Sequence, residues 1–298
     1  MRTVSRSGGW MERGDRLAVC MLVPAMSIII LILLVPLMYS LVTSFFQYNP
    51  MHPENNAFVG LSNYINILTD PDGRKSLYKT IIFAGVSVSF ELVLGVIFAL
   101  ILNLSFRGNR LVRTIILVPM MVSQVVAALS WLLMFHADVG LLNYLLGLFG
   151  IPGQLWLGNE LAMVSVILVE IWQHTPFVTL IVLAGLQGLP KEVLEAAAVD
   201  GASGWRRLWT VVLPLIKPII LVALVFRTMF TLRVFSPVWV LTGGGPANET
   251  LVAGVDIYRT AFRYHEFGTA TALSWILIFV TFVITIIYMY FLRRESVS

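Results

Sequence analysis

Long apolar stretches recur along the chain and are separated by short polar connections. Each stretch is about as long as a helix that crosses a bilayer, roughly 20 residues. The connections are too short to hold a folded soluble domain, so the pattern predicts an all-α membrane protein with six transmembrane helices in one membrane domain over 17–292. The stretches lie near 17–45, 77–105, 112–135, 161–188, 215–241 and 267–292.

Two of the polar connections carry shorter amphipathic patterns. The connection 47–76 contains FVGLSNYINIL between turn-forming residues, and the connection 136–160 contains GLLNYLLGLFGIPG. Both predict short helices at the membrane surface. The first apolar run is far longer than the 7–15 residues of a signal-peptide core, so it is predicted to be a retained membrane helix.

The basic residues concentrate in alternate connections, which predicts the orientation of the chain. Short connections rich in Lys and Arg remain in the cytoplasm. The distribution predicts that both termini are cytoplasmic, with a cytoplasmic N-terminal segment 1–16, a cytoplasmic hairpin 189–218 and a cytoplasmic tail 293–298. The basic residues assigned to the cytoplasm are Arg2, Arg6, Arg13, Arg16, Arg107, Arg110, Arg113, Lys191, Arg206, Arg207, Lys217, Arg293 and Arg294, against Arg74, Lys75, Arg259 and Arg263 outside.

Composition agrees with a membrane protein and excludes several other classes. The chain of 298 residues is 58% hydrophobic and 12% charged, with a mean hydropathy of +0.87. An ordinary soluble domain carries about 25% charged residues. Cys20 is the only cysteine, so one chain holds neither a disulfide nor a cysteine metal site. The net charge of +4 is not gathered in a polar stretch with interleaved aromatics, which argues against nucleic-acid binding.

The connection 189–218, LPKEVLEAAAVDGASGWRRLWTVVLPLIKP, is the most informative stretch. Lys191 to Val199 predicts a short helix of good helix formers, and Asp200-Gly201 predicts a left-handed stop. Ser203 then caps a second helix, which is predicted to run through Leu213 and to end at Pro214. The result is a helix-turn-helix whose alanines have small side chains, so a partner can approach its backbone closely.

This spacing resembles the EAA loop of ABC importer permeases. The matching positions are Glu195-Ala196-Ala197, then Asp200-Gly201-Ala202, then Val211, Leu213 and Pro214, with Val211 where the family usually has isoleucine. Further segments resemble the carbohydrate-uptake branch of that family, of which the maltose permease is a member. These segments are FVGLSNY, WQHTPF and VLTGGGPANET.

The resemblance implies the type I ABC importer permease fold and a set of partners. It implies a bacterial inner-membrane location, a second permease subunit, an extracytoplasmic solute-binding protein and two ATPase subunits that bind ATP and Mg. This chain has no P-loop motif and is expected to hold no cofactor and no metal, and to be a transport subunit and not an enzyme. The residues implied to contact an ATPase subunit are Glu195, Ala196, Ala197, Asp200, Gly201 and Ala202.

Polar residues inside the predicted spans mark a candidate substrate pathway. A charge at the bilayer centre costs at least about 2.5–3.5 kcal/mol, so it must face a partner or a cavity. Amides, carboxylates and aromatic rings near the midplane are the groups that hold a hydroxyl-rich solute. The candidates are Glu170, Gln173, His174 and Phe177 in the fourth span, Arg227 and Thr231 in the fifth, and Ser123 and Gln124 in the third.

Several alternatives stay open at this stage. The same polar residues, and Glu91 in particular, can brace neighbouring helices without touching solute. The substrate can be a sugar or another polar solute, such as glycerol 3-phosphate, an alditol or a sugar derivative. A secondary transporter is a rival function, although no inverted repeat is evident. His265-Glu266 begins an HExxH pattern, but Thr269 stands at its last position, which argues against a zinc enzyme.

Overall fold

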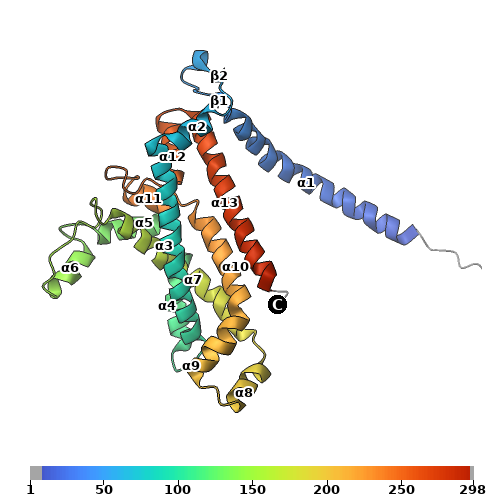
Figure 1. Cartoon of the computed structure of the whole chain (residues 1–298), viewed down its shortest axis with the longest axis vertical. Coiled ribbons are helices and arrows are strands. Elements are labelled where there is room, and N and C mark those ends of the chain that lie inside the picture. Colours follow the sequence, from blue (N-terminus) through green and yellow to red (C-terminus); the bar gives the residue numbers. More distant parts are fainter. Residues whose placement is uncertain (1–8, 296–298) are drawn as a thin grey trace, which may run out of the picture.

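The structure is a computed structural model that describes residues 9–295, with side chains described from 18 to 290. The parts of the predicted terminal segments at 1–8 and 296–298 lie outside the described residues. Figure 1 shows a bundle of long helices formed by α3 (Pro71–Leu102), α7 (Ala162–Gln187), α10 (Leu213–Thr231) and α13 (Phe267–Glu295). Within the described residues, 5 helices are long and apolar enough to cross a membrane, or 6 if a bent helix pair is one span. The predicted all-α membrane fold is confirmed.

The first long helix, α1 (Gly9–Thr43), diverges from the bundle (Figure 1). The most apolar stretch within Ala18–Thr43 has no buried residue. Pro24 and Pro36 lie inside this helix. The helix contacts the rest of the chain near its C-terminal end, at α13 and at β1 (Phe46–Gln47). Residues 9–16, predicted as a separate cytoplasmic segment, belong to the same helix.

One end of the bundle carries small elements that follow α1, and we call it the outer end because the predicted topology places these connections outside. β1 pairs antiparallel with β2 (Ala57–Phe58), with the 3₁₀ turn η1 (Pro53–Asn55) between them. The predicted helix in the first long connection is α2 (Ser62–Thr69), and the amide of Asn63 donates to the carbonyls of Ser44 and Phe46. α12 (Ala253–Tyr258) and the π-helix η3 (Arg259–Arg263) complete this end.

One predicted boundary near the outer end needs adjustment, and one predicted helix is confirmed. α3 begins at Pro71 and not near 77, because the Asp70 carboxylate accepts a hydrogen bond from Gly73 N at 3.1 Å and Pro71 suits a first helical position. The second connection helix is α6 (Leu141–Leu148), as predicted from its amphipathic pattern.

The third predicted span is not a straight helix. It consists of α4 (Asn109–Met121) and α5 (Gln124–Met134), which meet at an angle of 100°. The break falls at Val122, whose backbone is extended, shortly after Pro119. The Gln173 amide donates to the freed Val122 carbonyl at 2.9 Å, so α7 holds the bend in place.

The fifth predicted span is shorter than 215–241. α10 ends at Thr231, and a separate short helix, α11 (Ser236–Leu241), follows with Pro237 in its first turn. Proline suits the start of a helix because its missing N–H would have no partner there. Arg233 was predicted inside this span, but it lies in the break between the two helices.

The opposite end, called the inner end, carries the predicted hairpin (Figure 1). α8 (Lys191–Val199) is confirmed, Gly201 has a left-handed φ of 77°, and Ser203 Oγ accepts from Arg206 N at 3.4 Å. α9 (Gly204–Arg207) then continues through the π-helix η2 (Leu208–Val212) into α10. The prediction that Pro214 ends the second helix is wrong. Pro214 lies in the first turn of α10, after a π turn has already changed the bonding pattern.

Close helix approaches set the geometry of the bundle. A Cβ atom on Gly95 of α3 would lie 2.5 Å from Val178 Cγ1 of α7, and one on Gly185 of α7 would lie 2.6 Å from Ile219 Cδ1 of α10. Small residues at such crossings let backbones approach. Since Gly95 lies one helical turn after Glu91, the α3–α7 crossing also brings the Glu91 carboxylate towards the bundle interior.

Candidate functional site

Arg227 of α10 lies at the centre of a buried polar cluster. Its Nε donates to Glu91 Oε2 at 2.6 Å, and its Nη2 donates to Glu91 Oε1 at 2.9 Å, which makes a bidentate pair. Nη2 also donates to Glu170 Oε1 at 2.8 Å and to Thr231 Oγ1 at 3.0 Å. The cluster therefore ties together α3, α7 and α10.

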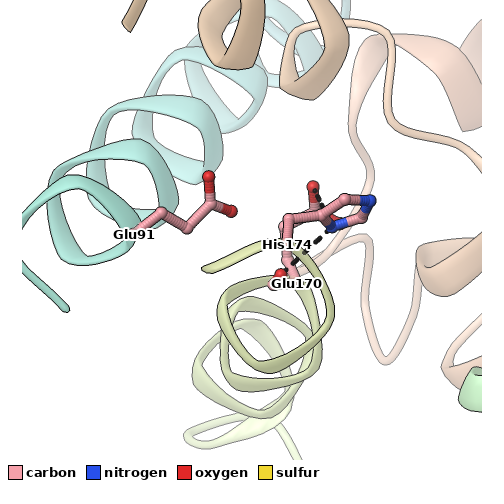
Figure 2. Close-up of side chains that lie close together, drawn as sticks. All are labelled: Glu91, Glu170 and His174. Carbon is pink, nitrogen blue, oxygen red and sulfur yellow. Dashed lines mark hydrogen bonds and ion pairs between the residues drawn. The ribbon is translucent and has the colours of Figure 1, made fainter. Parts of the chain in front are cut away.

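His174 extends this cluster along α7. Its Nδ1 lies 3.2 Å from Glu170 Oε1 and 3.1 Å from the Glu170 carbonyl oxygen, and the dashed lines in Figure 2 mark these contacts. Its Nε2 lies 3.4 Å from the Gln124 amide nitrogen of α5. The imidazole thus connects the ion-paired cluster to the helix that follows the 100° bend.

Glu91, Glu170 and His174 together have the donor types of a metal site. Their ligand atoms lie within 4.8 Å of one another. However, the Arg227 guanidinium already donates to both carboxylates and supplies the positive charge that they need. Buried charges in a membrane require such a partner. The arrangement fits a charge-compensated brace between helices.

A cavity of about 470 Å³ opens beside the cluster, within the usual size range of a ligand pocket. Polar and aromatic side chains share its wall, and Phe235 and Arg233 from the break after α10 contribute to it. The predicted pathway residues that line it are Gln124, Glu170, His174, Phe177 and Arg227.

The other predicted pathway residues act as supports in this structure. Gln173 is buried and holds the bend through Val122, while Thr231 accepts from Arg227. Ser123 lies at the bend and precedes α5. None of these three is part of the cavity wall among the described residues.

Three residues of the cluster and the cavity wall were not among the predicted pathway residues: Glu91, Arg233 and Phe235. Glu91 was recognised as a charged residue in a span, but its spacing on α3 gives no sign of its partner on α10. The positions of Arg233 and Phe235 in the cavity wall were not predicted, because a continuous helix was predicted through the break after Thr231.

Some acceptors of the site have no hydrogen-bond partner among the described residues. Glu170 Oε2 and Gln173 Oε1 are both buried and unpaired there. An unsatisfied buried acceptor is costly, commonly about 1–3 kcal/mol. Glu170 lines the cavity, but its Oε2 is enclosed by the protein and is not on the open cavity surface.

The six predicted coupling residues lie together at the inner end. Glu195 and Ala196 are exposed on α8, and Asp200 and Gly201 are exposed in the turn that follows it. Ala197 and Ala202 are half-buried. The hairpin therefore presents a helix with small side chains and carboxylates away from the bundle, as predicted.

The sequence is similar to that of known proteins over most of its length. Residues 91–297 match the family model described as "Binding-protein-dependent transport system inner membrane component". The chain is 38% identical to a probable ABC transporter permease protein, y4oQ, of Sinorhizobium fredii, covering 96% of this chain and 93% of the relative. It is 37% identical to the trehalose/maltose transport system permease protein MalF of Thermococcus litoralis, covering 93% and 94%.

Solved structures show the same fold. The chain matches the crystal structure of a bacterial ABC transporter involved in the import of the acidic polysaccharide alginate, with a TM-score of 0.84, 25% identity and coverage of 96% of this chain and 98% of the other. It also matches the alginate transporter in complex with an alginate pentasaccharide-bound periplasmic protein, with a TM-score of 0.83, 25% identity and coverage of 96% and 97%. This chain therefore belongs to the family of inner-membrane components of binding-protein-dependent ABC import systems.

Proposed function

We propose that this chain is a permease subunit of an ATP-driven sugar importer and that solute passes through the cavity beside Arg227. The observation that carries the proposal is the cavity of about 470 Å³ between the long helices, walled by carboxylate, imidazole, amide and aromatic groups. A pocket with a few placed polar groups among apolar ones is typical of ligand binding. The sugar relatives support the choice of solute.

The wall of the cavity has the chemistry that a saccharide needs. Glu170, Gln124 and His174 line the wall and bring carboxylate, amide and imidazole groups to it. Phe177 and Phe235 offer ring surfaces to the C–H side of a sugar. Glu91 and Thr231 hold the Arg227 guanidinium from behind. The residues of the cavity wall are therefore proposed to bind sugar, while Glu91 and Thr231 hold Arg227 in place.

The proposed assembly contains a second permease, two ATPase subunits and a solute-binding protein in a bacterial inner membrane. The apolar side chains of Ala18–Thr43 are exposed along α1, so this helix has surface available for lipid and a second subunit. The exposed residues Glu195, Ala196, Asp200 and Gly201, with the half-buried Ala197 and Ala202, form the surface proposed for an ATPase subunit. ATP and Mg would bind to that subunit, and no cofactor is assigned to this chain.

Continuity of the inner-end helix supports a mechanical link between hairpin and cavity. Helical structure runs from Gly204 through the π turn to Thr231, and Arg227 lies one turn before its end. A displacement of the hairpin by the ATPase subunits is therefore carried to Arg227. In the proposed cycle, that displacement opens the cavity outward to receive sugar, and hydrolysis returns it.

The test is uptake of radiolabelled trehalose and maltose by proteoliposomes that contain the assembled transporter and its binding protein. Uptake is expected to require ATP and to fall at least about tenfold in Glu170→Gln, because its carboxylate binds both Arg227 and sugar. Glu160→Gln, in the connection before α7, is the control and should retain uptake. Transport without ATPase subunits, or no uptake of any saccharide by the wild type, would refute the proposal.

An acidic solute is a second candidate, and Arg233 is the observation that favours it. Arg233 lines the cavity and is exposed, and the only hydrogen bond of its side chain within the described residues is Nε to the Met229 carbonyl at 3.2 Å. A guanidinium without a carboxylate partner is suited to a carboxylate or phosphate. Competition by glycerol 3-phosphate or a uronic acid, lost in Arg233→Gln and absent for neutral sugars, would select this candidate.

A further inference from the structure

Four aromatic side chains form a continuous row from the cavity towards the outer end. We call Phe235, Trp239, Tyr258 and Phe262 the aromatic ladder. Phe235 and Trp239 stack with ring centroids 5.8 Å apart and planes 13° apart. Trp239 and Tyr258 are 4.7 Å apart, Phe235 and Tyr258 are also in contact at 5.3 Å, and Tyr258 and Phe262 are 5.2 Å apart. The row joins α11, α12 and η3, which are separate elements of the chain.

The ladder begins in the cavity wall and ends on an open surface. Phe235 lines the cavity beside Arg233 and Ser236. Trp239 and Tyr258 are each 37% exposed, and Phe262 is 61% exposed. Large aromatic rings usually bury most of their surface in a core. Trp239, Tyr258 and Phe262 instead keep exposed ring surface between the cavity and the outer end.

The core below the ladder is filled by other side chains. Pro237, Val238 and Leu241 form the buried side of α11, and Val255 does the same for α12. Phe235 packs against this core, whereas the exposed surfaces of Trp239, Tyr258 and Phe262 are not needed to close it and need another explanation.

The backbone that carries the ladder is held firmly. Lys79 Nζ donates to the Asn248 carbonyl at 2.7 Å, and Arg259 donates to Asn248 Oδ1 at 3.0 Å and to the Gly243 carbonyl at 2.6 Å. Ala253 N donates to Thr80 Oγ1 at 2.7 Å. These bonds fix the loop between α11 and α12, so the rings are held in place before any ligand arrives, which lowers the entropic cost of binding.

Polar groups accompany the rings, which favours a saccharide over a lipid chain as the occupant. Arg233 and Ser236 lie beside Phe235 at the cavity, and the Tyr258 hydroxyl has no hydrogen-bond partner among the side chains and backbone that the structure describes. A sugar offers both a C–H face for a ring and hydroxyls for such groups. An acyl chain would use only the rings.

We propose that the aromatic ladder is a saccharide-binding track that receives sugar at the outer end and passes it, ring by ring, into the cavity. The inference rests on the proposed function and extends it to residues beyond the cavity. Successive rings at 4.7–5.8 Å let a sugar ring leave one aromatic face as it contacts the next. No single strong site then retains the solute.

The test is uptake by the assembled transporter in proteoliposomes, with maltose and maltotriose as probes. Trp239→Ala and Tyr258→Ala should each lower the initial rate about three- to tenfold, the range that corresponds to one aromatic contact. Trp239→Phe and Tyr258→Phe should keep most of the rate because a ring face remains. The loss should be larger for maltotriose, which contacts more rings, and basal ATP hydrolysis should not change.

Trp172→Ala is the matched control, because Trp172 is also 37% exposed and also contacts another ring, Trp131 at 5.6 Å, but lies outside the ladder. Equal rates for Trp239→Ala and Trp172→Ala, or equal losses for Trp239→Ala and Trp239→Phe, would overturn the ladder while leaving the importer intact. Phe262→Ala, at the most exposed ring, gives the same test if Trp239→Ala does not assemble. Absence of saccharide uptake by the wild type would overturn the proposed function as well.

Discussion

Replacement of Arg227 by glutamine is predicted to be among the most damaging single changes in the bundle. The guanidinium makes a bidentate pair with Glu91 and a further bond of 2.8 Å to Glu170. Removal of one member of a buried ion pair typically costs about 3–5 kcal/mol. Here the loss strands two buried carboxylates within one cluster, so the free energy of unfolding should fall by at least that amount.

Glu91→Gln should be milder than Arg227→Gln. It leaves Arg227 paired with Glu170, so the cost is that of weakened charge-assisted bonds, about 1.5–3 kcal/mol. The double variant should be less destabilised than the sum of the two single variants, because Glu91→Gln removes one of the carboxylates that Arg227→Gln strands.

The assay is unfolding of the detergent-purified protein, followed by tryptophan fluorescence, for both single variants, the double variant and Arg263→Gln as an exposed control. Additive effects of Glu91→Gln and Arg227→Gln would refute the reasoning. So would an Arg227→Gln variant as stable as the Arg263→Gln control.

Three further predictions concern packing, coupling and pH. Gly95→Ala should cost about 1–3 kcal/mol in thermal unfolding, since its Cβ would meet Val178, whereas Gly85→Ala, with open space around it, should be nearly neutral. Gly201→Ala, at a left-handed φ of 77°, should strain the hairpin by about 1–2 kcal/mol and reduce sugar carried per ATP hydrolysed in proteoliposomes; an unchanged ratio would contradict a coupling role. Burial raises the pKa of Asp256 at the outer end, so its folded form holds a proton that the unfolded form releases. Melting temperature should therefore fall as pH rises from the ordinary aspartate value through the raised one, and Asp256→Asn should reduce that slope.

The sequence predicted the local elements of this fold well because their signals are local. Lys191–Val199 is a run of helix formers before a glycine, and the structure has a helix over those residues. The pairing of Glu170 with Arg227 agrees with the expectation that each charge in a span faces a partner or a cavity. Such inferences need no knowledge of how the helices cross.

The errors arose where distant contacts decide the backbone. The 100° bend after Met121 is completed by a hydrogen bond from Gln173, which the third span itself does not encode. Pro214 was predicted to end a helix, but a π turn absorbs the change in bonding. The bidentate contact of Glu91 depends on the close crossing at Gly95, which only the packed bundle reveals.

The divergence of α1 has a consequence for how the subunit is built. Because the helix contacts the described part of the bundle near its C-terminal end, its apolar surface is left exposed and is suited to contact with lipid. Anchoring of α1 in the membrane is therefore structurally separate from the packing of the other helices around Arg227. The first helix can act as an independent tether, while the remaining helices complete the transport core.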